Sequence, residues 1–188
     1  MNTINKRIKL GDVVFISIPN VLYRKVAATT KSWTSHVGFV HSFKDGEWQI
    51  AESAVPTCTI TPLSKFIDRS ENGMFAVRRL KEPLNEEAIS KLQKAAESRM
   101  GRLYHFGFKL HSKRQFCSKF VYQVYKEALN IEVGSVTTFR ELLQTNPEAP
   151  LTFWRLWYFG FIPWKRMTIT PASQLRCPKL ETVFEKIQ

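Results

Sequence analysis

The stretch QFCSKFVYQVY, residues 115–125, decides how this chain folds. Placed on a helix, its apolar residues share one face with Ala128, which predicts a helix packed against a core. Cys117 lies in the first turn, directly after the basic pair Lys113 and Arg114. Partial positive charge at a helix N-terminus, together with nearby cations, favours a thiolate. Cys117 is therefore either a nucleophile or a small apolar residue on a buried helix face.

A hairpin upstream supplies the candidate partners of this cysteine. Residues 35–41 alternate as a strand does, and Asp45-Gly46 is a strong hairpin-turn signal. Residues 48–54 then return as the next strand, which places Glu52 on the same face as His36. A carboxylate on a mostly apolar strand is costly to bury without a partner, and a histidine ring is one such partner. The alternative is that Glu52 lies in water at a frayed strand end.

Length and composition indicate one globular domain. The chain has 188 residues, no internal repeat and no run of the roughly 18–20 apolar residues that a membrane-spanning helix needs. The first residues show no apolar signal segment, and Cys58, Cys117 and Cys177 form no disulfide framework, so we expect a cytoplasmic location. The net charge of +12 favours an anionic partner or simply a soluble basic surface. No nucleic-acid-binding signature accompanies the charge, and we expect no specific nucleic-acid partner.

Five motifs in order resemble the circularly permuted branch of the NlpC-type papain-like superfamily. The similarity is greatest to the YiiX/YebB-like group and more distant to lecithin:retinol acyltransferase. The motifs are GDVVF at 11–15, SHVG at 35–38, AES at 51–53, GxxY at 101–104 and FCSKFV at 116–121. A late segment, residues 169–175, resembles the closing proline-containing loop of that family. The resemblance implies an α+β fold in which an antiparallel sheet packs against helices, with the cysteine at a helix N-terminus.

The same resemblance implies the site residues. Cys117 would be the nucleophile, His36 the base and Glu52 the third member of a triad, with Ser35 and Gln115 as lesser candidates for that third role. Tyr104 would line the site and is a candidate second oxyanion donor beside the Cys117 N–H. One departure is His105, at a position where relatives often have Asp.

Beyond the triad, the sequence predicts neither metal nor cofactor. His41 and His111 have no metal-ligand spacing with a cysteine or carboxylate. We expect Ser35, Tyr104 and Trp157 to contact substrate.

An aromatic-rich segment, residues 153–164, lies within a predicted insertion near 139–168 of the single domain 1–188. Three interpretations of this segment stay open. It forms an apolar wall of the substrate pocket, an interfacial patch flanked by Arg155, Lys165 and Arg166, or core packed against the sheet.

The leading hypothesis is a cysteine hydrolase or acyltransferase that cleaves an amide or ester through a thioester. A small-molecule, lipid-like or peptide substrate is expected, and peripheral contact with an anionic membrane is a further expectation. The alternative is a basic binding module for anionic membrane or nucleic acid on a papain-like scaffold. The sequence does not indicate an oligomeric state.

Overall fold

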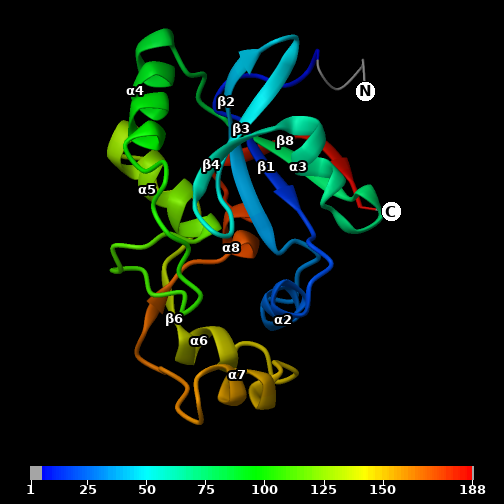
Figure 1. The fold of residues 1–188 in the computed structure, drawn as a ribbon, viewed down its shortest axis with the longest axis vertical. Coiled ribbons are helices and arrows are strands. Elements are labelled where there is room, and N and C mark those ends of the chain that lie inside the picture. Colours follow the sequence, from blue (N-terminus) through cyan, green and yellow to red (C-terminus); the bar gives the residue numbers. More distant parts are fainter. Residues whose placement is uncertain (1–5, 188) are drawn as a thin grey trace.

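The computed structural model describes residues 6–187, and its centre is a six-stranded antiparallel sheet (Figure 1). The strand order is β4-β3-β2-β1-β5-β8. The strands are β1 (Val13–Ile16), β2 (His36–Lys44), β3 (Glu47–Ser53), β4 (Cys58–Pro62), β5 (Phe75–Leu80) and β8 (Leu180–Lys186). Hydrophobic residues occupy both faces of β1 and β2, so the sheet is covered on both sides.

The helices α4 (Glu86–Glu97) and α5 (Cys117–Leu129) cover one face of the sheet. Phe120, Val121 and Val124 of α5 pack there with Phe39 of β2, as the apolar helix face predicts. On the other face, α3 (Leu63–Asp68) places Phe66 against Val40 and Ile50. The predicted α+β fold, with the cysteine at the start of a helix, is therefore confirmed.

The β2–β3 hairpin also forms as predicted. Asp45 and Gly46 both have positive φ angles, 53° and 78°, which a tight two-residue hairpin turn requires. The register pairs Gly38 with Glu52. Because side chains alternate along a strand, Glu52 lies on the same face of the sheet as His36.

A smaller cluster of helices lies below the sheet in Figure 1. Its helices are α2 (Val21–Thr29), α6 (Phe139–Gln144) and α7 (Leu151–Trp157), and the short strands β6 (Thr137–Thr138) and β7 (Met167–Thr168) accompany them. Helix α8 (Pro171–Leu175) lies higher in Figure 1, in contact with α5, and the short helix η1 (Glu71–Gly73) precedes β5. Phe139, Trp154 and Ile162 pack with Leu22 of α2 in a hydrophobic cluster separate from those of the sheet. Trp154 Nε1 also donates a hydrogen bond to Thr29 Oγ1 over 2.7 Å, which joins α7 to α2.

The aromatic-rich segment therefore does not have a single environment. Trp154 and Ile162 are buried, as the core interpretation predicts, whereas Leu156, Phe159 and Phe161 are exposed to solvent. Among residues 6–187, no helix combines the length and apolar character that crossing a membrane requires.

Candidate active site

Cys117 is the first residue of α5 and is 4% exposed. The preceding residue, Phe116, is extended and contributes no side-chain cap, so the first-turn N–H groups receive no acceptor from it. Lys119, in the same turn, donates hydrogen bonds to the carbonyl oxygens of Ser112 and Arg114 over 2.5 and 2.7 Å. These hydrogen bonds hold the loop before α5 against the first turn of the helix, in which Cys117 lies.

His36 begins β2, is fully buried and forms one strong hydrogen bond. Its Nε2 atom lies 2.6 Å from Glu52 Oε2. Its Nδ1 atom is buried and has no hydrogen-bond partner within the described part of the chain. Burial lowers the pKa of His36, but nearby Cys117 and Glu52 outweigh burial and raise it to about 9. An imidazolium is therefore favoured at neutral pH, with Nδ1 as the nitrogen available to the thiol.

Glu52 is held as a carboxylate by more than the histidine. Arg69 NH2 donates to both of its oxygens over 2.8 Å, and Thr61 Oγ1 donates to Oε1 over 2.6 Å. Burial raises the pKa of Glu52, but His36 and Arg69 outweigh it and lower the pKa to about 2. Sequence reasoning missed both partners, because neither the C-cap position of Arg69 after α3 nor a threonine on β4 carries a chemical signature.

Close packing fixes the orientation of the His36 ring. Phe66 lies 5.6 Å from it between ring centroids, and Tyr23 of α2 meets it edge-on at 5.9 Å. Gly38 makes room for this arrangement. A Cβ atom there would lie 2.6 Å from Ile50 Cγ2 and 3.2 Å from the Phe66 ring. The glycine of the SHVG motif is therefore required by close packing beside the histidine.

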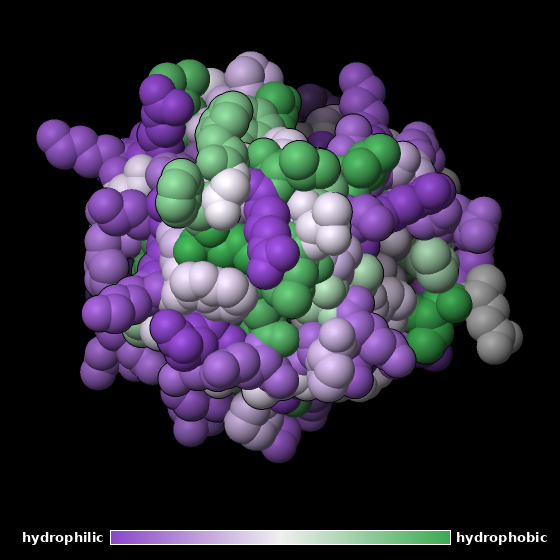
Figure 2. Space-filling view, turned by 90° about the horizontal axis from the view of Figure 1, so that it is seen from below, coloured by the Kyte–Doolittle hydropathy of each residue, from purple (hydrophilic) through white to green (hydrophobic). Residues whose placement is uncertain are grey.

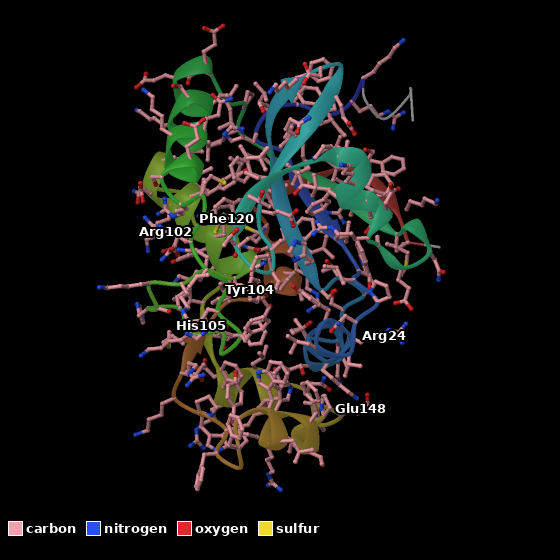
Figure 3. The ribbon with its side chains drawn as sticks, viewed as in Figure 1. Arg24, Arg102, Tyr104, His105, Phe120 and Glu148 are labelled. Atoms are coloured by element: carbon pink, nitrogen blue, oxygen red, sulfur yellow. The ribbon has the colours of Figure 1, made fainter. Side chains whose placement is uncertain are left out.

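Tyr104 and Ser35, two of the predicted substrate-contacting residues, line a cavity together with Cys117. The Tyr104 backbone bridges to Gln115 just before α5, and Figure 3 shows Tyr104 near the start of that helix. Its hydroxyl is buried, without a hydrogen-bond partner in the described residues. Burial and the charges of Cys117 and Tyr23 raise the pKa of Tyr104 well above its usual value. Tyr104 is therefore a neutral hydrogen-bond donor facing the thiol.

The cavity beside Cys117 is mostly apolar and narrow, with a volume of about 30 Å³. Its wall away from the cysteine comes from the helices below the sheet and from the loop that precedes α5. The lining residues there include Val26, Phe108, Phe139, Leu142 and Trp154. Such a wall suits a hydrocarbon group rather than a charged one.

Trp157 lies outside this cavity. It is absent from the cavity lining, which instead contains Trp154 from one turn earlier in α7. Trp157 Nε1 donates to the Phe106 carbonyl over 3.0 Å, and its ring stacks on Phe153. It lines a separate, open groove at the surface. Any contact of Trp157 with substrate stays a prediction.

The remaining polar candidates are engaged away from the triad. Gln115 Nε2 donates to Gln123 Oε1 over 3.1 Å, and Ser35 Oγ accepts from the Ile18 N–H over 2.9 Å. His105 Nδ1 accepts from the Gly107 N–H over 2.9 Å, so it shapes its own loop next to Tyr104 (Figure 3). Within residues 6–187, no three His, Cys, Asp or Glu side chains are grouped to hold a metal ion.

Comparison with known proteins assigns the chain to a family. Residues 7–184 match the family described as permuted papain-like amidase enzymes, YaeF/YiiX, C92. The uncharacterized protein YiiX of Escherichia coli K12 is 28% identical over 176 residues, which cover 94% of this chain and 86% of that protein. The crystal structure of the metalloprotein yiiX from Escherichia coli O157:H7 superimposes with a TM-score of 0.88 at 28% identity, covering 96% of this chain and 98% of that one.

Proposed function

The chain belongs to the permuted papain-like amidase family, and from that premise we propose that it is a cysteine hydrolase with Cys117, His36 and Glu52 as its catalytic triad. The observation that carries the proposal is the buried hydrogen bond between His36 Nε2 and Glu52. The other ring nitrogen, Nδ1, makes no hydrogen bond in the described residues, and His36 lies near Cys117 at the start of α5.

The first half-reaction follows from this arrangement. The Cys117 thiolate attacks the carbonyl carbon of an amide or ester, and the carbonyl π electrons move to oxygen. The Cys117 N–H and the Tyr104 hydroxyl are the donors for this oxyanion. When the tetrahedral intermediate collapses, the bond to the leaving group breaks and protonated His36 gives its Nδ1 proton to that group.

The second half-reaction releases the acyl group. Neutral His36 removes a proton from water, or from an acceptor alcohol or amine, as that group attacks the thioester carbon. The carbon–sulfur bond then breaks and regenerates the thiolate. Glu52 holds the ring in place through Nε2 and stabilises the imidazolium, while Arg69 and Thr61 keep the carboxylate ionised and oriented.

The apolar wall of the cavity supports an apolar acyl group as the substrate class. Burying such a group is worth roughly 25 cal/mol for each Å² removed from water. The cavity carries no charged lining residue that would select an acidic or basic side chain. An amide or ester with an apolar acyl group therefore suits this wall better than a charged peptide, and its entry requires the cavity to widen beyond the roughly 30 Å³ that is free.

Active-site labelling tests the proposal. A small fluorescent thiol-reactive acyl probe should label Cys117 at neutral pH in preference to Cys58 and Cys177, and His36→Ala should abolish that preference. All three thiols are buried, so accessibility alone does not favour Cys117, and burial raises the pKa of Cys58. Cys58→Ser is the matched control and should label like the unaltered chain.

Intact-mass analysis after mixing with a p-nitrophenyl acyl ester should show one acyl group, on Cys117. Slow and equal labelling of all three thiols, with no acyl adduct, would favour the binding-module alternative.

A further inference from the structure

We infer that the turn after α7 is a docking surface for an anionic lipid membrane. The apolar tip of this surface consists of Leu156, Phe159 and Phe161. Their exposed fractions are 76%, 93% and 86%, the largest among the big hydrophobic residues that the structure describes. This inference does not depend on the proposed catalytic function.

The tip is a fixed structure rather than a loose loop. Phe159 and Gly160 both have positive φ angles, 51° and 94°. The Gly160 N–H donates to the Arg155 carbonyl over 2.7 Å, and the Phe161 N–H donates to the Tyr158 carbonyl over 3.1 Å. This hydrogen-bonded helix ending turns the two phenylalanines outward, while Ile162 directly behind them is buried in the helical cluster.

Cations lie close to the tip in the sequence, and Arg140 lies over the ring of Trp164. Arg140, Arg155 and Lys165 are exposed, and none of them belongs to an ion pair recorded in the described residues. The sequence contains no Asp or Glu between Glu148 and Glu181. Figure 2 looks onto this end of the molecule and shows hydrophobic side chains gathered in the middle of the face, with hydrophilic ones between and around them.

Apolar side chains bordered by Arg and Lys match the two layers of an anionic membrane surface. The rings enter the boundary between headgroups and acyl chains, and the cations meet the phosphates above it. A second copy of the chain is a poorer occupant. The three side chains offer on the order of 500 Å², whereas a stable dimer buries about 800 Å² on each partner. A second basic copy would also bring like charges together.

The position of α7 relates this surface to the cavity. Trp154 lines the cavity beside Cys117, and Trp157, one turn later, lines the outer groove together with the tip. A membrane bound at the tip would therefore lie on the side of the molecule where the apolar wall of the cavity is built. An acyl chain would therefore have a short path from that membrane to the cavity. Membrane binding itself does not require such a transfer.

Vesicle co-sedimentation of the full chain tests the inference. Vesicles of equal parts phosphatidylglycerol and phosphatidylcholine should bind the protein, and vesicles of phosphatidylcholine alone should bind it at least tenfold more weakly. Phe159→Ser with Phe161→Ser should lower binding at least tenfold. The matched control is Phe43→Ser, because Phe43 is 55% exposed on the hairpin at the far end of the sheet, and it should change nothing.

Two double variants that remove the same net charge measure the contribution of the cations near the tip. Arg155→Gln with Lys165→Gln should weaken binding about 25-fold, because each cation near an anionic surface contributes about fivefold. Lys44→Gln with Lys81→Gln removes the same charge from exposed positions elsewhere and should weaken it far less. Equal losses in the two pairs would mean that net charge alone drives binding, and would overturn the inference.

A measurement on the unaltered chain removes any dependence on variant folding. Lipids brominated on their acyl chains should quench tryptophan fluorescence, since Trp157 and Trp164 flank the tip. Absence of quenching, concentration-dependent dimerisation that Phe159→Ser abolishes, or tighter binding to a single-stranded oligonucleotide than to anionic vesicles would each overturn the inference.

Discussion

Arg69 contacts both carboxylate oxygens of Glu52, each over 2.8 Å, while His36 contacts one of them over 2.6 Å. The buried carboxylate therefore lies between two cationic partners, of which only the histidine faces the thiol. In the proposed reaction Arg69 is a positioning residue, because it would act through Glu52 rather than on the substrate.

We expect Glu52→Gln to lower kcat/KM by about 10²-fold, within the range that general acid–base groups contribute. The amide cannot stabilise the imidazolium, so the pKa of His36 falls from about 9 towards its ordinary value. The measurement is the pH profile of acyl-ester hydrolysis together with kcat/KM. Glu87→Gln, an exposed site on α4, is the control and should leave both unchanged. An unaltered profile in Glu52→Gln would remove Glu52 from the triad.

We expect Arg69→Gln to cost about tenfold in kcat and little in KM, because the residue touches Glu52 rather than substrate. Without the guanidinium, the pKa of Glu52 rises from about 2, so the acidic limb of the rate profile moves to higher pH. Arg69→Lys should restore part of the activity. Arg24→Gln breaks an exposed ion pair with Glu71 and is the control. A changed thermal midpoint with an unmoved acidic limb would assign Arg69 a structural role only.

The free energy of unfolding should depend on pH through both members of the pair, Glu52 at acidic pH and His36 at basic pH. The folded pKa of Glu52 is depressed, so its contribution is present above the ordinary value of 4.5 and is lost as pH falls through about 2. The folded pKa of His36 is raised, so its contribution is complete below 6.5 and is lost as pH rises through about 9.

The thermal midpoint should therefore decline from pH 6.5 to 9 more steeply in the unaltered chain than in His36→Gln. Differential scanning calorimetry of the two proteins measures this. Parallel declines would contradict the raised pKa of His36.

Gly38→Ala should destabilise the fold by about 1–3 kcal/mol, the usual cost of overpacking. The added Cβ atom would meet Ile50 Cγ2 at 2.6 Å and the Ala51 carbonyl oxygen at 2.9 Å. Activity should fall further than stability explains, because Phe66 and the His36 ring must move. Urea unfolding and kcat/KM are compared, with Thr59→Ala on the exposed face of β4 as control. A fully active, stable variant would disprove the packing role.

Trp154→Ala should cost about 3–5 kcal/mol of unfolding free energy, because it removes a buried aromatic ring and its hydrogen bond to Thr29. Trp157→Ala should cost less, since that ring lies at the surface groove. Shortening the acyl chain of an ester substrate should affect KM in the unaltered protein and in Trp157→Ala alike. If KM no longer depended on acyl-chain length in Trp157→Ala, Trp157 would be a substrate-contacting residue.

The sequence alone determined the parts of this protein that depend on local periodicity. Apolar spacing over residues 115–125 predicted the helix that begins at Cys117, and Asp45-Gly46 predicted the hairpin turn. Once that turn is placed, alternation along the two strands puts Glu52 on the face of His36, and the structure confirms this placement. The physical reason is that a helix repeats every 3.6 residues and a strand every two, so neighbours on one element, or across one hairpin, follow from numbering.

Tertiary structure alone decided which residues from separate elements meet. Arg69 reaches Glu52 only because α3 lies over the face of the sheet that carries the carboxylate. Trp154 and Trp157 lie three residues apart and share one side of α7, so periodicity does not distinguish them. The way α7 packs against α2 turns Trp154 into the cavity and leaves Trp157 at the outer groove. Such contacts depend on how whole helices and sheets fit together, which no local pattern encodes.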